Sequence, residues 1–216
     1  MDFALGYPAC MDGEADFGKL SAGRWDVDSG DVARFKAGDE DAFESLVTRR
    51  EREVYQVALR MLGTPDDAQE AVQDTFLRAF RSLKAFREDA TFRTWILGIA
   101  INVCRTRLTS AAERDRRKTA SLTVQEPEEI HPREIPLPDS SPSPESMALG
   151  GELRAAIHAA LLSLPPDHRE VLVLREIQEL EYEDLATALS CPVGTVKSRL
   201  CRARQALREA LEGIWP

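Results

Sequence analysis

Residues 182–208 read YEDLATALSCPVGTVKSRLCRARQALR, and this stretch decides the fold of the C-terminal part of the chain. Its first part, about Tyr182 to Leu189, has the apolar spacing of a short helix. The segment Ser190-Cys191-Pro192-Val193 interrupts that spacing, and a second helix is predicted from about Gly194 to Leu211. Two helices joined by a tight turn, the second of them basic, predict a helix-turn-helix.

The second of these helices is predicted to be amphipathic. At about 100° per residue one face is apolar, formed by Val196, Leu200, Ala203, Leu207 and Leu211. The opposite face is polar and basic, formed by Lys197, Ser198, Cys201, Arg202, Gln205 and Arg208. Lysine and arginine can contact phosphates or guanine, and serine permits close approach to a base edge. An ordinary solvated helix would share this pattern, and the turn before it is what favours DNA reading.

Proline and charge divide the rest of the chain into segments. Residues 119–144 hold six of the twelve prolines, and residues 119–150 hold six acidic side chains against one basic one. Residues 1–31 hold seven acidic side chains against two basic ones, so these two segments account for more than the whole net charge of −9. We therefore expect an acidic disordered tail at 1–31, a first domain at 32–118, a flexible acidic linker at 119–144 and a second domain at 145–216.

The fold class expected from these patterns is all-α, with two small helical domains joined by the flexible linker. In the first domain, helices are predicted at about 40–62, at 65–83 and from 91 onward, with Asp39 and Thr64 as caps. In the second domain, a helix at about 145–163 ends before Pro165-Pro166, and Asp167 is expected to cap the next short helix.

Several functional classes are disfavoured by what the sequence lacks. It shows no apolar run long enough to span a bilayer and no signal peptide, so we expect a cytoplasmic protein without membrane insertion. Its four cysteines form no C-x-x-C pair and its three histidines are scattered, so no metal site and no cofactor is expected. The common phosphate-binding, dinucleotide-binding and metalloprotease motifs are absent as well, which makes an enzyme the weakest class.

Both predicted domains resemble the extracytoplasmic-function branch of the bacterial sigma-70 family. In the C-terminal domain the resemblance to sigma region 4 rests on Leu164-Pro165, Arg169-Glu170-Val171, Leu174-Arg175-Glu176, residues 182–186 (YEDLA) and residues 191–199 (CPVGTVKSR). In the N-terminal domain the resemblance to region 2 rests on Gly38-Asp39, Ala42-Phe43, residues 67–76 (DAQEAVQDTF), residues 92–96 (FRTWI) and residues 99–102 (IAIN). The two blocks in this order, without a middle domain, are typical of that branch.

The resemblance implies three sets of site residues. Core RNA polymerase would be bound by Glu70, Gln73 and Asp74; the melted −10 element by Phe86, Asn102 and Arg105; the −35 duplex by Lys197, Ser198, Cys201 and Arg202. Phe86 could equally be a core residue. Cys201 departs from the aromatic residue or histidine often found at its position, which leaves the local base preference open.

The expected function is that of a sigma factor that binds core polymerase and directs promoter-specific initiation, in response to a stress or envelope signal. An anti-sigma factor is a possible further partner. A polymerase-independent helix-turn-helix regulator is the first alternative, although the N-terminal domain shows no strand pattern for a ligand domain. A protein that sequesters polymerase without recognising promoters is the second.

Overall fold

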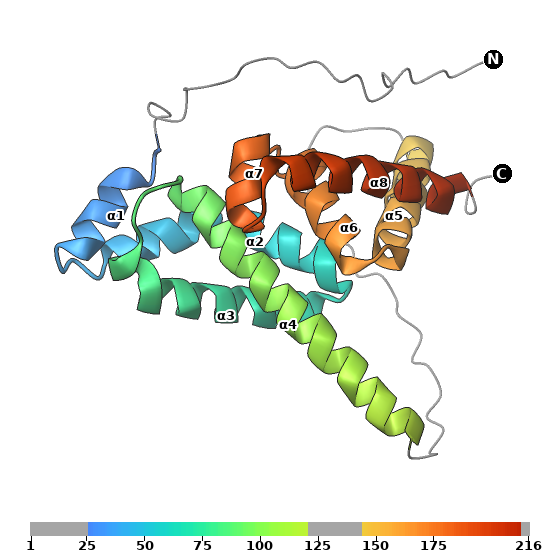
Figure 1. Cartoon of the computed structure of the whole chain (residues 1–216), viewed down its shortest axis with the longest axis horizontal. Helices are drawn as coiled ribbons and strands as arrows, with labels where there is room; N and C mark the ends of the chain where they lie inside the picture. The colour runs from blue at the N-terminus through green and yellow to red at the C-terminus, as the bar shows by residue number, and fades with distance from the viewer. Residues whose placement is uncertain (1–25, 121–143, 213–216) are drawn as a thin grey trace.

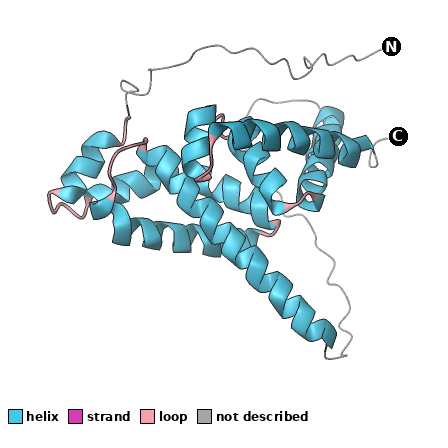
Figure 2. Ribbon diagram, in the orientation of Figure 1, coloured by secondary structure: helices cyan, strands magenta, loops and turns pink. Residues whose placement is uncertain are grey.

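The computed structural model describes residues 26–120 and 144–212, and every regular element within these two ranges is a helix (Figure 2). This confirms the all-α expectation. The predicted tail residues 1–25 and the predicted linker residues 121–143 lie outside the described residues.

The N-terminal domain is a bundle whose long helices α2, α3 and α4 pack on one another (Figure 1). Its elements are α1 (Ser29–Lys36), α2 (Ala42–Leu62), α3 (Pro65–Ser82), a 3-10 turn (Leu83–Ala85) and α4 (Phe92–Ala120). The core between them is fully buried and includes Leu46, Met61, Phe92, Ile96 and Ile101. The C-terminal half of α4 extends away from the bundle (Figure 1).

The junction between α2 and α3 forms as the sequence predicts. Gly63 ends α2 with a φ of 90°, a left-handed conformation that glycine adopts without steric cost. Thr64 then caps α3, because its hydroxyl oxygen accepts a hydrogen bond from the backbone N–H of Asp67, and Pro65 occupies the first helical position. The predicted cap of α2 is wrong: the carboxylate of Asp39 pairs with Arg34 at 2.7 Å instead.

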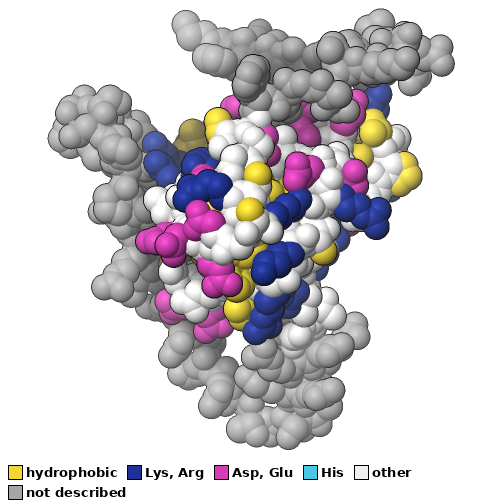
Figure 3. Space-filling model, turned by 90° about the vertical axis from the view of Figure 1, so that its left-hand side faces the viewer, with side chains coloured by type: hydrophobic (Ala, Val, Ile, Leu, Met, Phe, Trp, Pro, Cys, Tyr) yellow, Lys and Arg dark blue, Asp and Glu magenta, His cyan; other side chains and the backbone are white. Residues whose placement is uncertain are grey.

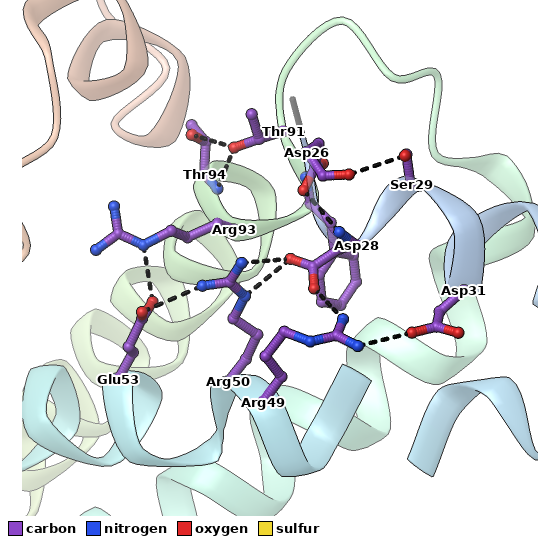
Figure 4. Close-up of polar contacts among 11 residues, drawn as sticks. Asp26, Asp28, Ser29, Asp31, Arg49, Arg50, Glu53, Thr91, Arg93 and Thr94 are labelled. Atoms are coloured by element: carbon purple, nitrogen blue, oxygen red, sulfur yellow. Dashed lines mark hydrogen bonds and ion pairs between the residues drawn. The ribbon is translucent and has the colours of Figure 1, made fainter. Parts of the chain in front are cut away.

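The first domain begins earlier than residue 32, the boundary placed by sequence. Asp28 is fully buried, and its carboxylate pairs with the guanidinium groups of Arg49 and Arg50 from α2 (Figure 4). Asp26 accepts a hydrogen bond of 2.9 Å from the backbone N–H of Phe92, at the start of α4. These ion pairs and hydrogen bonds hold residues 26–31 on the bundle, so these residues belong to the first domain.

Charge is mixed at the α1 end of the molecule. Figure 3 shows acidic and basic side chains intermingled on that face. Arg34 bonds Asp31 at 3.2 Å, and Arg49 bonds the other carboxylate oxygen of Asp31 at 2.9 Å. Asp31 of α1 therefore acts as a partner for two arginines of the first domain.

The C-terminal domain contains four α-helices in the range 144–212. Its elements are α5 (Pro144–Ser163), α6 (Pro166–Leu172), a π-helical turn (Val173–Ile177), α7 (Tyr182–Ala188) and α8 (Val193–Glu212). The cap expected at Asp167 is wrong, because Pro165 is the N-cap and Asp167 lies in the first turn of α6. An acidic side chain there still opposes the positive end of the helix.

The two domains contact one another along α4 and the end of α2. Helix α7 packs across α4 (Figure 1), and α5 and α6 pack on α2. A Cβ at Gly98 would lie 3.0 Å from the backbone oxygen of Ala188, so a side chain there would force α7 away from α4 by a few tenths of an ångström. Buried Arg169 donates to the carbonyl oxygens of Leu161 and Leu164 in its own domain and of Met61 at the end of α2.

Candidate nucleic-acid interface

The turn between α7 and α8 sets the angle of the last helix. Ser190 follows α7 with a φ of 52°, and the N–H of Cys191 donates to the carbonyl of Ala186 at 3.0 Å. This is the bonding of a helix end closed by a left-handed residue. After Pro192, whose carbonyl accepts from the N–H of Val196 at 3.1 Å, the chain enters α8 at once. The predicted helix-turn-helix is present.

Helix α8 is amphipathic in the predicted register. Val196, Leu200 and Ala203 are buried against the rest of the domain. The predicted outward residues Lys197, Ser198, Cys201, Arg202, Gln205 and Arg208 are all exposed. The Ser198 hydroxyl donates to the carbonyl of Thr195, and Arg202 donates from Nε to the carbonyl of Ser198 at 3.3 Å.

The basic residues of α8 divide into two groups. Arg199 pairs with Glu170 at 3.1 Å, and Arg204 pairs with Glu176 at 2.7 Å, so both guanidinium groups are engaged within the domain. Lys197 and Arg202 have no such acidic partner among the ion pairs of the described residues, and they lie on the outward face. We call the part of the outward face formed by Lys197, Ser198, Cys201 and Arg202 the reading face.

The residues expected to hold the −10 element are brought together only in part. Asn102 and Arg105 lie one turn apart on α4, and Arg105 donates to the side-chain oxygen of Asn102 at 3.2 Å. Phe86 is half-buried and stacks on Trp95 with ring centroids 4.8 Å apart. Because Trp95 precedes Asn102 by seven residues, the ring of Phe86 lies roughly 10 Å from Asn102 along the axis of α4.

Arg105 also connects the two domains. It donates to both carboxylate oxygens of Glu170, from Nε at 2.6 Å and from a terminal nitrogen at 2.5 Å. Glu170 is fully buried, and Arg199 of α8 binds the same carboxylate. The hydrogen bond to Glu170 raises the pKa of Arg105 above its usual value. One buried carboxylate thus holds a cation from each domain.

The three residues expected to bind polymerase lie on α3. Glu70 and Gln73 are exposed and Asp74 is partly exposed. Sequence reasoning missed their neighbour Arg107 of α4, which bonds Glu70 at 2.8 Å and Asp74 at 2.6 Å. The pKa of Arg107 is raised by the hydrogen bond to Glu70 and then by that to Asp74. No periodicity links residues 33 and 37 positions apart, so only the fold reveals this contact.

Cysteine and histidine play no joint role in the described part of the chain. No cluster of three or more histidine, cysteine or acidic residues in it has the arrangement of a metal site. Cys104 is buried, Cys191 is half-buried and Cys201 is exposed on the reading face. Burial raises the pKa of the Cys104 thiol to about 12. Among the described helices, none has the length and apolar character needed to cross a bilayer.

Two family models match the chain. The model described as "Sigma-70 region 2" matches residues 46–114, and the model described as "Sigma-70, region 4" matches residues 154–207. The matches therefore cover the α2 to α4 bundle and the helix-turn-helix with the helices before it.

Curated relatives cover most of the chain. The RNA polymerase sigma-H factor of Pseudomonas aeruginosa is 39% identical over 183 residues, which span 85% of this chain and 93% of the relative. The ECF RNA polymerase sigma-E factor of Escherichia coli K12 is 36% identical over the same shares of the two chains.

Solved structures share the fold. CnrH, determined in complex with the cytosolic domain of CnrY, has a TM-score of 0.62 and 27% identity and matches 87% of this chain and 99% of its own. The sigma factor RpoE of Bartonella quintana, in complex with the anti-sigma factor NepR, has a TM-score of 0.59 at 24% identity, over 79% of this chain and 96% of its own. With both regions matched in order and relatives aligned over nearly their whole length, the chain belongs to the sigma-70 family, as an RNA polymerase sigma factor of the extracytoplasmic-function type.

Proposed function

We propose that this sigma factor binds core RNA polymerase through Glu70, Gln73 and Asp74 of α3 and reads a −35 duplex through the reading face of α8. The observation that carries the proposal is the reading face itself. Its lysine and arginine remain outward, whereas two other arginines of α8, Arg199 and Arg204, are engaged by carboxylates. An outward basic helix face after a tight turn is the element that enters a major groove.

We assign the −10 strand to Asn102 and Arg105, with Phe86 farther along α4. An amide can pair with base edges, and a guanidinium can bind backbone phosphate. Phe86 can offer an aromatic face only to a base that extends about two helical turns beyond Asn102, because its ring lies against Trp95. The protein would act in the cytoplasm and respond to a stress or envelope signal. It would also bind an anti-sigma factor, as RpoE of Bartonella quintana does in its complex with NepR.

Run-off transcription with purified core polymerase tests this function. We expect start-specific transcripts from a pool of genomic promoters when the chain is added. Lys197→Ala and Arg202→Ala should each lower transcription from −35-dependent promoters, with core binding unchanged. Gln205→Ala, an exposed neighbour on α8, is the matched control.

The main competing function is that of a polymerase-independent regulator. Such a protein would bind its operator equally well with and without core polymerase, and it would yield no start-specific transcript. Absence of transcripts across the pool, combined with tight operator binding by the free chain, would replace the sigma assignment of these residues with that alternative.

A further inference from the structure

Two acidic residues of α3 lie close to each other on an exposed face. Glu70 and Asp74 are four residues apart on one helix, and their side chains are 67% and 44% exposed. Like charges at this spacing repel each other and destabilise a helix slightly. Left alone, the two carboxylates would turn apart and populate many rotamers.

Arg107, on the neighbouring helix α4, holds the two carboxylates together. One terminal nitrogen donates to an oxygen of Glu70 at 2.8 Å, and the other donates to an oxygen of Asp74 at 2.6 Å. The planar guanidinium therefore spans both side chains, which a lysine ammonium on a flexible stem does less well. Each carboxylate keeps a second oxygen outside this pair of hydrogen bonds.

The position of Arg107 has an energetic cost that an ordinary surface ion pair lacks. Its side chain is only 25% exposed, and its Nε is buried and has no hydrogen-bond partner among the described residues. A buried donor without a partner is unfavourable and is rare in native structures. The unpaired Nε of Arg107 is therefore a cost to stability, while the two carboxylates stay largely in water.

The acidic pair belongs to a larger exposed stripe of α3. One and two turns after Gln73 and Asp74 lie Leu77, 49% exposed, and Phe80, 38% exposed. Helix positions three and four residues apart share a face, so the carboxylates, the amide and the apolar side chains form one surface. We call Glu70, Gln73, Asp74, Leu77 and Phe80 the α3 surface. It is complementary to a partner surface that combines basic and apolar side chains.

We infer that Arg107 is a positioning residue of the α3 surface, which fixes Glu70 and Asp74 in one arrangement before core polymerase binds. This rests on the proposed function, in which that surface binds polymerase. Ordering side chains at the moment of association weakens affinity, and order already present in the free protein avoids that loss. Removing the guanidinium should weaken core binding by roughly five- to twentyfold.

The alternative is that Arg107 shields the carboxylates and competes with the partner. The two roles predict effects of opposite sign. A shield that is removed leaves the α3 surface more acidic and strengthens its attraction to a basic partner. Removal of a positioning residue instead lowers the affinity for the partner, although the surface has become more acidic.

Binding of the full-length chain to fluorescently labelled core RNA polymerase separates these roles. Arg107→Met keeps an unbranched apolar side chain and removes the guanidinium group. Arg52→Met, an exposed arginine of α2, changes the net charge equally and is the matched control. Urea unfolding of each variant identifies any loss of binding that follows from loss of folding.

A double-mutant cycle gives the decisive result. We expect Arg107→Met to weaken core binding, Arg52→Met to leave it unchanged, and the effect of Arg107→Met to shrink to less than half in an Asp74→Asn background. Stronger or unchanged core binding by Arg107→Met overturns the inference, as does an effect of equal size in both backgrounds. If Glu70→Gln with Asp74→Asn leaves core binding intact, the proposed polymerase-binding site itself fails, and the two failures are thereby distinguished.

Discussion

Replacement of Glu170 by glutamine tests the contact that joins the two domains. The fully buried carboxylate accepts two hydrogen bonds from Arg105 and one from Arg199. Glutamine has nearly the same shape but is uncharged, and its amide group would face guanidinium donors. Breaking a buried ion pair by removing one partner costs about 3–5 kcal/mol. Arg105 and Arg199 are 36% and 23% exposed and can regain water, so we expect a loss of about 3 kcal/mol, at the lower end of that range.

The lost free energy affects both the unfolding of the C-terminal domain and the separation of the two domains. The bond from Arg199 lies within the C-terminal domain and should appear in its free energy of unfolding. The bonds from Arg105 cross between domains, and about 2 kcal/mol there corresponds to a roughly 30-fold shift from docked toward separated domains. Urea unfolding measures the first effect, and the radius of gyration from small-angle scattering measures the second. Arg105→Met should increase the radius of gyration without destabilising the C-terminal domain.

Glu176→Gln provides the matched control, because the same change is made in a pair whose side chains are 43% and 45% exposed. That substitution should cost less than about 1 kcal/mol. If Glu170→Gln changes neither the unfolding free energy by more than about 0.5 kcal/mol nor the radius of gyration, the carboxylate does not hold the two cations as argued.

Three further perturbations have expected outcomes. Gly98→Ala should stabilise α4 by about 0.5–1 kcal/mol yet increase the radius of gyration, because its methyl group would press on the Ala188 carbonyl; an unchanged radius would contradict the close approach. Ser190→Gly should raise the free energy of unfolding of the C-terminal domain by about 1 kcal/mol, since glycine removes the strain of the positive φ; Ala155→Gly, at an exposed position inside α5, should do the opposite. Unfolding free energy should fall as pH rises from 9.0 toward about 12, because the raised pKa of Cys104 keeps its thiol neutral only in the folded state, and Cys104→Ala should remove that part of the pH dependence.

Much of the fold follows from local sequence. The Gly63-Thr64-Pro65 junction needs only turn and capping chemistry, and it forms as predicted. The faces of α8 follow from helical periodicity alone. Helix α1 was missed because it has only eight residues and lies in a segment rich in Gly and Asp. It forms because the buried Asp28 carboxylate meets two arginines of α2, which is a tertiary contact that local propensity does not contain.

The residues of the candidate site could be predicted from the sequence, but the contacts among them could not. The exposed residues of α3 and α8 were located by spacing and by resemblance to the family. Arg105 looks like any helical arginine in the sequence, and its partner Glu170 is 65 residues away. Charged residues are rarely fully buried, so sequence favours an exposed Glu170 and gives no reason to pair it with Arg105. Whether the assigned residues bind DNA stays a prediction.

The Arg105–Glu170 pair has a consequence for the ionic-strength dependence of promoter binding. Affinity for DNA falls with salt in proportion to the number of counterions that protein cations displace from phosphates. Lys197 and Arg202 are exposed, and under the proposed function they would contribute fully to that number. Arg105 is already paired with the carboxylate of Glu170. If a DNA phosphate bound Arg105 instead, the phosphate would release a counterion, but the freed carboxylate would take one up. Salt titrations of promoter binding therefore count the cations of α8 and omit that of α4, even where both helices contact DNA.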